Sequence, residues 1–354
     1  MRHSILPRPL LSLTLALSAL PALAQDVNVT LQPVREKFAR SDEVLVRVTL
    51  QNTSATPQFL LKWHTPVAGV QAPLFEVLRD GQPVRYLGIK AKRPAPGPDD
   101  YLRLEPGATL TSTVELSALY EMNVTGPYQL RYRTASSGLF AASGMRPVPG
   151  ALASSQVGIW IDGRLPRGAR VPAKQAVAGA ASLEFSKCSN AQQEQLAAAV
   201  DAGKAMTVDA HNYLAPGAGG AQYGARYGTW FGALDAGRAA TVNTNFTAIR
   251  DAFETRPLKI DCGCNENYFA YVYPAQPYAI YVCKAFWTAP LTGTDSRGGT
   301  LLHELSHFDV VAATDDHVYG QQGAAELARS APARAVNNAD SHEYFGENSP
   351  PMIE

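Results

Sequence analysis

The hydrophobic pattern of this chain changes its period about halfway along, and this change limits the folds open to it. In the first half, Val44, Val46, Val48 and Leu50 alternate with polar residues, which is the pattern of a β-strand with one buried face. From Ser189 onward the apolar residues follow helical spacing instead. The pattern therefore predicts an all-β region followed by an α+β region.

The first half contains short strand patterns separated by turns, such as the Asp80-Gly81 pair that is typical of a hairpin. The expected strands cover residues 27–31, 44–50, 59–63, 75–78, 84–87, 110–116, 128–134 and 157–161. Short strands with turns at about ten-residue intervals favour an immunoglobulin-like sandwich over residues 25–164. Residues 165–183 are rich in Pro, Gly, Ala and Arg, and we expect an exposed linker there.

The second half predicts a mostly helical domain with one small β element. Ser189 is suited to cap a helix over residues 189–214. Further helices are expected over residues 230–253, from Thr300 onward, and over residues 323–329. Residues 267–286 are dense in Tyr, Val and Phe and are interrupted by prolines, which favours a strand pair. We expect this α+β domain to span residues 184–354.

The first 24 residues have the pattern of a secretory signal peptide. Arg2 and Arg8 precede an apolar stretch over residues 10–20, and residues 22–24, Ala-Leu-Ala, form an A-x-A cleavage site. The apolar stretch is shorter than the roughly 18–20 residues that span a bilayer, which disfavours the alternative of a membrane anchor. We therefore expect a secreted, extracellular protein with no membrane partner.

The cysteines agree with export, since all of them lie in the second half: Cys188, Cys262, Cys264 and Cys283. An even number of cysteines in an oxidising compartment predicts two disulfides. Cys262 and Cys264 are too close in sequence to pair comfortably, which leaves two possible pairings. A cysteine zinc site is the weaker alternative, because the C-x-C pair has no C-x₂-C partner.

Charge is divided unevenly between the halves, although the whole chain has a formal net charge of zero. Residues 25–174 contain 18 basic and 12 acidic side chains, a net of +6. Residues 175–354 contain 11 basic and 19 acidic side chains, a net of −8. The zero total excludes a strongly basic nucleic-acid-binding protein, and the opposite charges of the halves favour their association.

The chemistry of the chain centres on the H-E-x-x-H motif at residues 303–307. On a helix, His303 and His307 share one face and can bind the same Zn²⁺. Glu304 lies beside them as the candidate general base for a water molecule. Zinc needs a third protein ligand, and the sequence offers two carboxylates for it: Glu326, 19 residues after His307, and Asp316.

Residues 313–320, A-T-D-D-H-V-Y-G, resemble the G-T-x-D-x-x-Y-G segment that follows H-E-x-x-H in the deuterolysin family of zinc endopeptidases, the aspzincins. The matching positions are Thr314, Asp316, Tyr319 and Gly320. Ala313 departs from the pattern, where the family usually has Gly. The resemblance implies that Asp316 is the third zinc ligand and that Tyr319 stabilises the oxyanion. His317 falls at a variable position of the family and is expected to be a bystander.

A second segment, residues 338–345, resembles the N-A-D-x-x-E-Y-F segment of the peptidyl-Lys metalloendopeptidase branch of that family. This resemblance implies that Asp340 and Glu343 form an acidic pocket for the lysine of a substrate. It also implies the disulfides Cys188–Cys262 and Cys264–Cys283. The β region lies where the family carries its propeptide.

The resulting hypothesis is a secreted zinc metalloendopeptidase with one Zn²⁺ in a zincin-like α+β domain, preceded by a sandwich prodomain that acts as its inhibitor. We expect it to hydrolyse protein or peptide substrates on the amino side of lysine. No cysteine precedes Cys188, so the prodomain cannot inhibit through a thiol, and Lys174 is a candidate self-processing site in the linker. The alternatives are a broad-specificity protease, deuterolysin-like or with Glu326 as the zinc ligand, and an inactive secreted binding protein.

Overall fold

The computed structural model describes residues 26–352, except residues 68, 143, 172–180 and 216–223. The expected signal peptide and Lys174 lie outside the described residues. None of the helices within the described ranges combines the length and the apolar character that crossing a bilayer requires.

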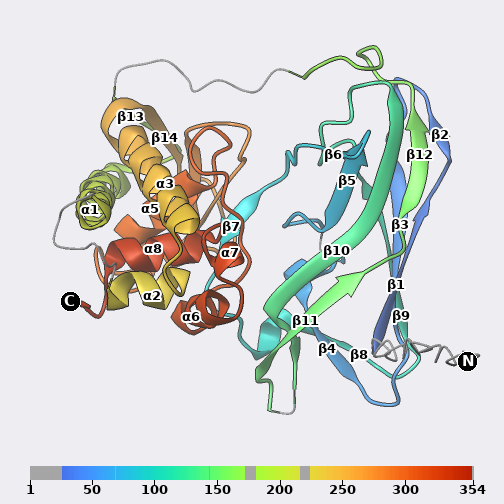
Figure 1. The fold of residues 1–354 in the computed structure, drawn as a ribbon, viewed down its shortest axis with the longest axis horizontal. Coiled ribbons are helices and arrows are strands. Elements are labelled where there is room, and N and C mark those ends of the chain that lie inside the picture. The colour runs from blue at the N-terminus through green and yellow to red at the C-terminus, as the bar shows by residue number, and fades with distance from the viewer. Residues whose placement is uncertain (1–25, 68, 143, 172–180, 216–223, 353–354) are drawn as a thin grey trace, which may run out of the picture.

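The N-terminal region, residues 26–171, is built from β-strands (Figure 1). Its smaller sheet is antiparallel, in the order β1 (Val27–Pro33), β3 (Leu45–Asn52), β9 (Thr109–Glu115). Its larger sheet centres on the long strand β10 (Gly126–Ala141). The other strands of the larger sheet are β2 (Lys37–Phe38), β4 (Gln58–Leu61), β5 (Phe75–Arg79), β6 (Gln82–Pro83), β8 (Tyr101–Leu104), β11 (Pro147–Ala153) and β12 (Val157–Ile161).

Both sheets of the N-terminal region contribute to one apolar core. In β3, Val46, Val48 and Leu50 are buried while alternate residues face outward, as the two-residue period of a strand requires. Tyr128 and Tyr132 of β10 belong to the same buried cluster. The region is therefore a two-sheet β structure with a shared core, and its immunoglobulin-like topology stays a prediction.

The C-terminal region, residues 182–352, combines helices with a mixed sheet. The strands β13 (Ser182–Ser186), β14 (Pro257–Asp261) and β16 (Ala279–Val282) are parallel, and β15 (Ala270–Val272) is antiparallel to β16. The helices are α1 (Asn190–Leu214), α2 (Ala225–Phe231), α3 (Ala236–Thr255), α4 (Lys284–Thr288), α5 (Arg297–Ser306), α6 (Gln321–Ser330), α7 (Pro332–Ala335) and α8 (Ala339–Glu347). Helix α5 lies at the centre, in contact with α1 and α8 and with β15 and β16.

Two expectations from the sequence are corrected by local structure. The single helix expected over residues 230–253 is two helices, because Gly232 between them has a φ of 80° and a Cβ there would lie 2.3 Å from the Ala328 carbonyl oxygen. The strand expected over residues 84–87 is absent, since Tyr86 forms only an isolated bridge with Tyr120. Beyond Tyr86 the chain leaves the N-terminal sheets.

Two disulfides fasten one end of the C-terminal sheet. Cys188, just after β13, is bonded to Cys262, just after β14. Cys264 is bonded to Cys283, which follows β16. This is the pairing that the family resemblance implied.

A strand from the N-terminal half completes the C-terminal sheet. Strand β7 (Lys90–Lys92) pairs antiparallel with β15, with Lys90 opposite Val272 and Lys92 opposite Ala270. Figure 1 shows β7 reaching away from the other strands of the N-terminal region to lie beside the helices of the C-terminal region. The sequence contains no local signal for this strand, whose three residues carry two lysines.

Candidate active site

The H-E-x-x-H motif lies on α5, a helix that is buried along residues 298–306. The Ser296 hydroxyl caps this helix by accepting a hydrogen bond from the Gly299 amide at 2.9 Å. Helices α1 and α5 approach closely at Gly203 and Gly298, where a Cβ on Gly203 would lie 2.8 Å from the Gly298 carbonyl oxygen. Small residues at this crossing therefore position the helix that carries both histidines.

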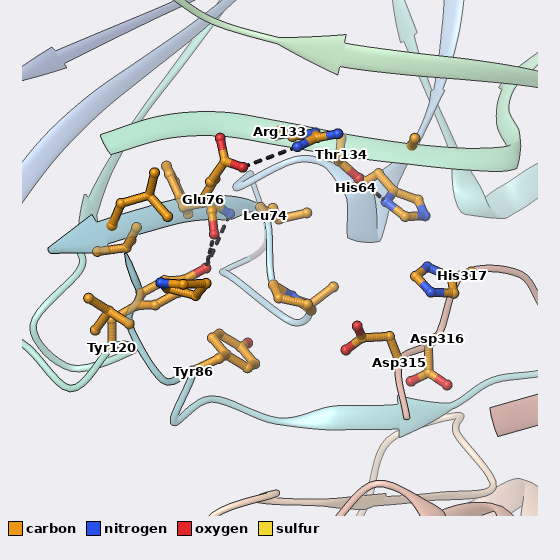
Figure 2. A pocket seen from close by; sticks show the side chains of 18 of the residues that line it. His64, Leu74, Glu76, Tyr86, Tyr120, Arg133, Thr134, Asp315, Asp316 and His317 are labelled. Atoms are coloured by element: carbon orange, nitrogen blue, oxygen red, sulfur yellow. Dashed lines mark hydrogen bonds and ion pairs between the residues drawn. The ribbon is translucent and has the colours of Figure 1, made fainter. Parts of the chain in front are cut away.

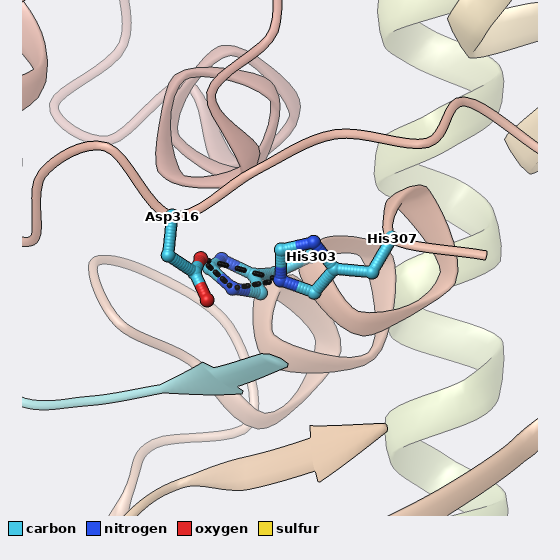
Figure 3. A group of neighbouring side chains, drawn as sticks. All are labelled: His303, His307 and Asp316. Carbon is cyan, nitrogen blue, oxygen red and sulfur yellow. Dashed lines mark hydrogen bonds and ion pairs between the residues drawn. The ribbon is translucent and has the colours of Figure 1, made fainter. Parts of the chain in front are cut away.

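His303, His307 and Asp316 converge on one point (Figure 3). The Nε2 atoms of the two histidines are 3.1 Å apart, and each lies 3.2 Å from Oδ1 of Asp316. Zinc bonds of about 2.0–2.2 Å in a tetrahedron place neighbouring ligand atoms roughly 3.3–3.5 Å apart. The Asp316 oxygen is buried and accepts no hydrogen bond from the described residues. The three side chains thus fit a zinc ion in both spacing and chemistry.

Hydrogen bonds orient His307 for a ligand role. Its Nδ1 donates to the Thr314 carbonyl oxygen at 2.8 Å, which leaves Nε2 directed at Asp316. Burial lowers the pKa of His307, which favours the neutral form that a metal ligand must have. Burial alone would raise the pKa of Asp316, but His307 and His303 hold it well below its usual range.

The opposite edge of His303 faces two further carboxylates. Its Nδ1 lies 3.0 Å from Oδ1 of Asp340 and 3.2 Å from Oε2 of Glu343, and all three side chains are fully buried. Burial alone would lower the pKa of His303, but Asp316, Asp340 and Glu343 hold it well above the usual value. Carboxylates behind a histidine ligand orient the ring and raise its basicity. Asp340 and Glu343 therefore orient His303, a candidate metal ligand, as well as lining a pocket.

Lys92 of β7 occupies that pocket. Its Nζ lies 2.7 Å from Oε2 of Glu343, 3.0 Å from Oδ1 of Asp295 and 3.9 Å from Oδ1 of Asp340. Burial alone would lower the pKa of Lys92, but these three acids hold it well above the usual value. Tyr344 donates a hydrogen bond to Asp295 at 2.8 Å. The pocket is thus shaped and charged for one ammonium group.

The peptide bond between Ala91 and Lys92 lies against the remaining candidate catalytic groups. The Tyr319 hydroxyl donates a hydrogen bond to the Ala91 carbonyl oxygen at 2.9 Å. The Lys92 amide donates to Oε1 of Glu304 at 3.2 Å. Burial raises the pKa of Glu304 to about 8, which suits a group that exchanges protons near neutral pH. The carbonyl and the amide of one peptide bond therefore each meet a candidate catalytic side chain.

The other residues weighed from the sequence lie apart from this arrangement. Glu326 on α6 is half-exposed, forms an ion pair with Arg329, and belongs to neither cluster of potential ligands among the described residues. His317 contacts Asn337 and Arg334 instead of the His303–His307 pair. Sequence reasoning missed Asp295, which no motif contains, and missed Lys92, for which the lysine pair in Lys90–Lys92 was the available signal.

Comparison with known proteins finds one matching family model and several similar sequences. The family model described as lysine-specific metallo-endopeptidase matches residues 218–347. The chain is 48% identical over 315 residues to a protein named "Extracellular protease" from Aeromonas hydrophila, covering 88% of this chain and 89% of that protein. It is 31% identical over 344 residues to the "Peptidyl-Lys metalloendopeptidase" of Armillaria mellea, covering 95% of this chain and 94% of that enzyme.

Two further relatives resemble only part of the chain. The "Peptidyl-Lys metalloendopeptidase" of Pleurotus ostreatus is 45% identical over 170 residues, which are 48% of this chain and 98% of that enzyme. A solved structure of a zinc peptidase from Grifola frondosa is 42% identical, covers 47% of this chain and 100% of that one, and gives a TM-score of 0.44.

Proposed function

The chain belongs to the aspzincin family of zinc metalloendopeptidases, in its peptidyl-Lys branch, and from this premise we propose that it is a secreted enzyme that cleaves peptide bonds on the amino side of lysine. The observation that carries the proposal is Lys92 in its acidic pocket, directly after a peptide bond that contacts Glu304 and Tyr319. A substrate bound in the same register would have its own lysine in this pocket.

His303, His307 and Asp316 would hold one Zn²⁺ per catalytic domain. When bound, zinc lowers the pKa of a water molecule and polarises a substrate carbonyl. His303 is oriented for this role by Asp340 and Glu343, and His307 by the Thr314 carbonyl. The protein thus supplies a carboxylate and two imidazoles, and the second ring nitrogen of each imidazole is already engaged.

Glu304 is the proposed general base and acid. It takes a proton from the attacking water and delivers it to the leaving amine, which corresponds in position to the Lys92 nitrogen, 3.2 Å from Oε1 of Glu304. Tyr319 stabilises the charge that develops on the carbonyl oxygen, because its hydroxyl already donates to the equivalent oxygen of Ala91. Both roles follow from contacts with the same peptide bond.

The pocket favours lysine over arginine because its acidic groups surround the position of one nitrogen atom, Nζ of Lys92. The Lys92 ammonium lies between Glu343 and Asp295, with the rings of Phe269 and Tyr344 at 4.9 and 5.6 Å from Nζ to the ring centroid. An ammonium group is compact and donates in three directions, whereas the guanidinium group of arginine needs a planar fork of acceptors.

The N-terminal region is the proposed prodomain and inhibitor, an immunoglobulin-like sandwich over residues 25–164 that follows a signal peptide at residues 1–24. It would block the enzyme by placing β7 where a substrate strand binds, and processing within residues 165–183 would separate it from the catalytic domain at residues 184–354. The pairing of β7 with β15 supports this role. Secretion is supported by the relative named "Extracellular protease".

Digestion of a protein mixture tests the specificity. The products of the matured enzyme are identified by mass spectrometry, and we expect lysine as the first residue of most new peptides. Products that begin as often with arginine or with apolar residues would instead assign a broad-specificity protease.

A further inference from the structure

A second lysine of β7 is buried against a carboxylate that the lysine pocket does not include. Lys90 is 8% exposed, and its Nζ lies 2.6 Å from Oδ1 of Asp315 and 2.6 Å from the Thr314 carbonyl oxygen. Within the described part of the chain, Lys90 is the cation with which Asp315 forms an ion pair. Asp315 takes no part in the metal cluster or in the contacts of Lys92.

The register of β7 indicates which position of a substrate Lys90 corresponds to. Residues two apart in a strand point to the same face, so Lys90 and Lys92 both face the C-terminal region from β7. If the cleaved bond corresponds to Ala91–Lys92, Lys90 occupies the second position before the cut. A substrate strand paired with β15 in the same register would place its own residue at that position beside Asp315.

Asp315 is held in place independently of β7. Its amide donates to the Asn337 carbonyl oxygen at 2.7 Å, and its carbonyl oxygen accepts from the Ala339 amide at 3.0 Å. The carboxylate also borders a cavity of about 570 Å³ that separates it from His64 and Glu76 of the N-terminal region (Figure 2). The backbone that carries Asp315 is therefore fixed by contacts within the C-terminal region.

We propose that Asp315 and the Thr314 carbonyl form a second specificity subsite, which favours Lys or Arg two positions before the cleaved bond. The preferred substrate sequence is then a basic residue, any residue, and lysine, with the cut before the lysine. The proposal rests on the proposed function, because the register assumes cleavage before lysine. A partly exposed ion pair of this kind should raise kcat/KM by about fivefold to tenfold.

Competition between peptides tests the subsite. Three peptides that share Ala-Lys at the cleaved bond, and carry Arg, Ala or Glu one residue earlier, are digested together by enzyme matured from the full-length chain. Because they compete in one tube, the ratios of their rates give kcat/KM ratios that do not depend on the amount of active enzyme. We expect Arg to exceed Ala by about fivefold to tenfold, and Glu to be the slowest.

Variants then assign the preference to Asp315. Asp315→Asn should bring the Arg-to-Ala ratio close to one, and Asp315→Lys should make the Glu peptide the fastest. Glu184→Gln is the matched control, since it removes one acid from β13 at the opposite edge of the same sheet and should keep the wild-type ratio. Zinc content is measured for each variant, because Asp315 adjoins the ligand Asp316.

The ratio of kcat/KM values in the wild type tests the subsite even if a variant fails to fold. An Arg-to-Ala ratio near one in the wild type, or a ratio that survives in Asp315→Asn, overturns the subsite while cleavage before lysine stands. Cleavage of all three peptides at bonds other than Ala-Lys overturns the proposed function itself, and the register with it.

Discussion

The two edges of the His303 ring face similar acids but are suited to different cations. At Nε2, His307 and Asp316 complete a triangle of ligand atoms with sides of 3.1–3.2 Å. At Nδ1, Asp340 and Glu343 close around the ammonium of Lys92. The difference lies in the donor atoms, since two imidazole nitrogens with one carboxylate suit zinc, whereas oxygens alone suit an ammonium group. One imidazole therefore links the proposed zinc site to the proposed pocket for the substrate lysine.

Removing Asp316 should have the largest effect of these predictions. The change removes a proposed zinc ligand at the Nε2 edge of His303 and leaves the acidic pocket at its Nδ1 edge unchanged. Asp316→Ala should lose tightly bound zinc and reduce activity by more than about 10³-fold, since zinc supplies several kcal/mol of transition-state stabilisation. Metal analysis and peptide hydrolysis check both effects. Glu326→Ala is the control and should retain both, and zinc loss in that variant alone would reverse the ligand assignment.

Glu304→Gln should separate chemistry from metal binding. The amide cannot take a proton from water, so kcat should fall by about 10²–10⁴-fold, while zinc content stays at the wild-type value. The same variant should also remain full-length if the enzyme processes itself. Normal turnover by this variant would remove Glu304 from its role as base.

Variants of Asp340 and Asp295 should differ in their zinc affinity. Asp340 contacts both His303 and Lys92, whereas Asp295 contacts only Lys92 of these two. Asp340→Asn should lower kcat/KM for lysine substrates by at least about tenfold and weaken zinc binding by about 10–100-fold. Asp295→Asn should lower lysine cleavage without changing zinc affinity, measured by chelator competition. Equal zinc affinities in the two variants would mean that the edges of His303 act independently.

Lys92→Ala should empty the acidic pocket beside Nδ1 of His303. It should leave the cluster of proposed zinc ligands intact. In the unprocessed chain, hydrolysis of a short lysine peptide should begin at least about tenfold faster than in the wild type, because a buried charged contact of the inhibitor is lost. Lys37→Ala, which removes an exposed lysine of the same region, is the control. Unchanged latency in Lys92→Ala would place inhibition elsewhere.

Lowering the pH should produce the smallest effect of these predictions, through protonation of Asp295. Burial alone would raise the pKa of Asp295, but Lys92 holds it below its usual value. A lowered pKa means that the stabilisation is present above the ordinary value of about 3.8 and is lost as the pH falls below it. Asp295→Asn should therefore lower the melting temperature of the full chain by about 1–2 °C at pH 7, a figure reduced for partial exposure. The difference should shrink as the pH falls from 3.8 through the lowered pKa of the folded state, and a constant difference would contradict the charge explanation.

The parts of this molecule that the sequence predicts well are those with a local signal. The H-E-x-x-H spacing follows from helix geometry, and the alternation through Val46 and Val48 follows from strand geometry. Strand β7 has no such signal, because its partner β15 lies about 180 residues away and its lysines would be assigned to a solvated surface. Asp295 also has no local signal in the sequence, since only the packing of α5 and α8 brings it to the pocket. The false strand at residues 84–87 arose because the sequence does not reveal where the chain leaves its sheet.

The insertion of β7 also makes occupancy of the site independent of concentration. Strand and cleft belong to one chain, so their association is intramolecular and is governed by an effective concentration that dilution does not change. A precursor of this kind would stay closed however far it diffused from the cell. Once the connecting segment is cut, the same contacts become an ordinary bimolecular equilibrium, and dilution into the surroundings would then release the enzyme.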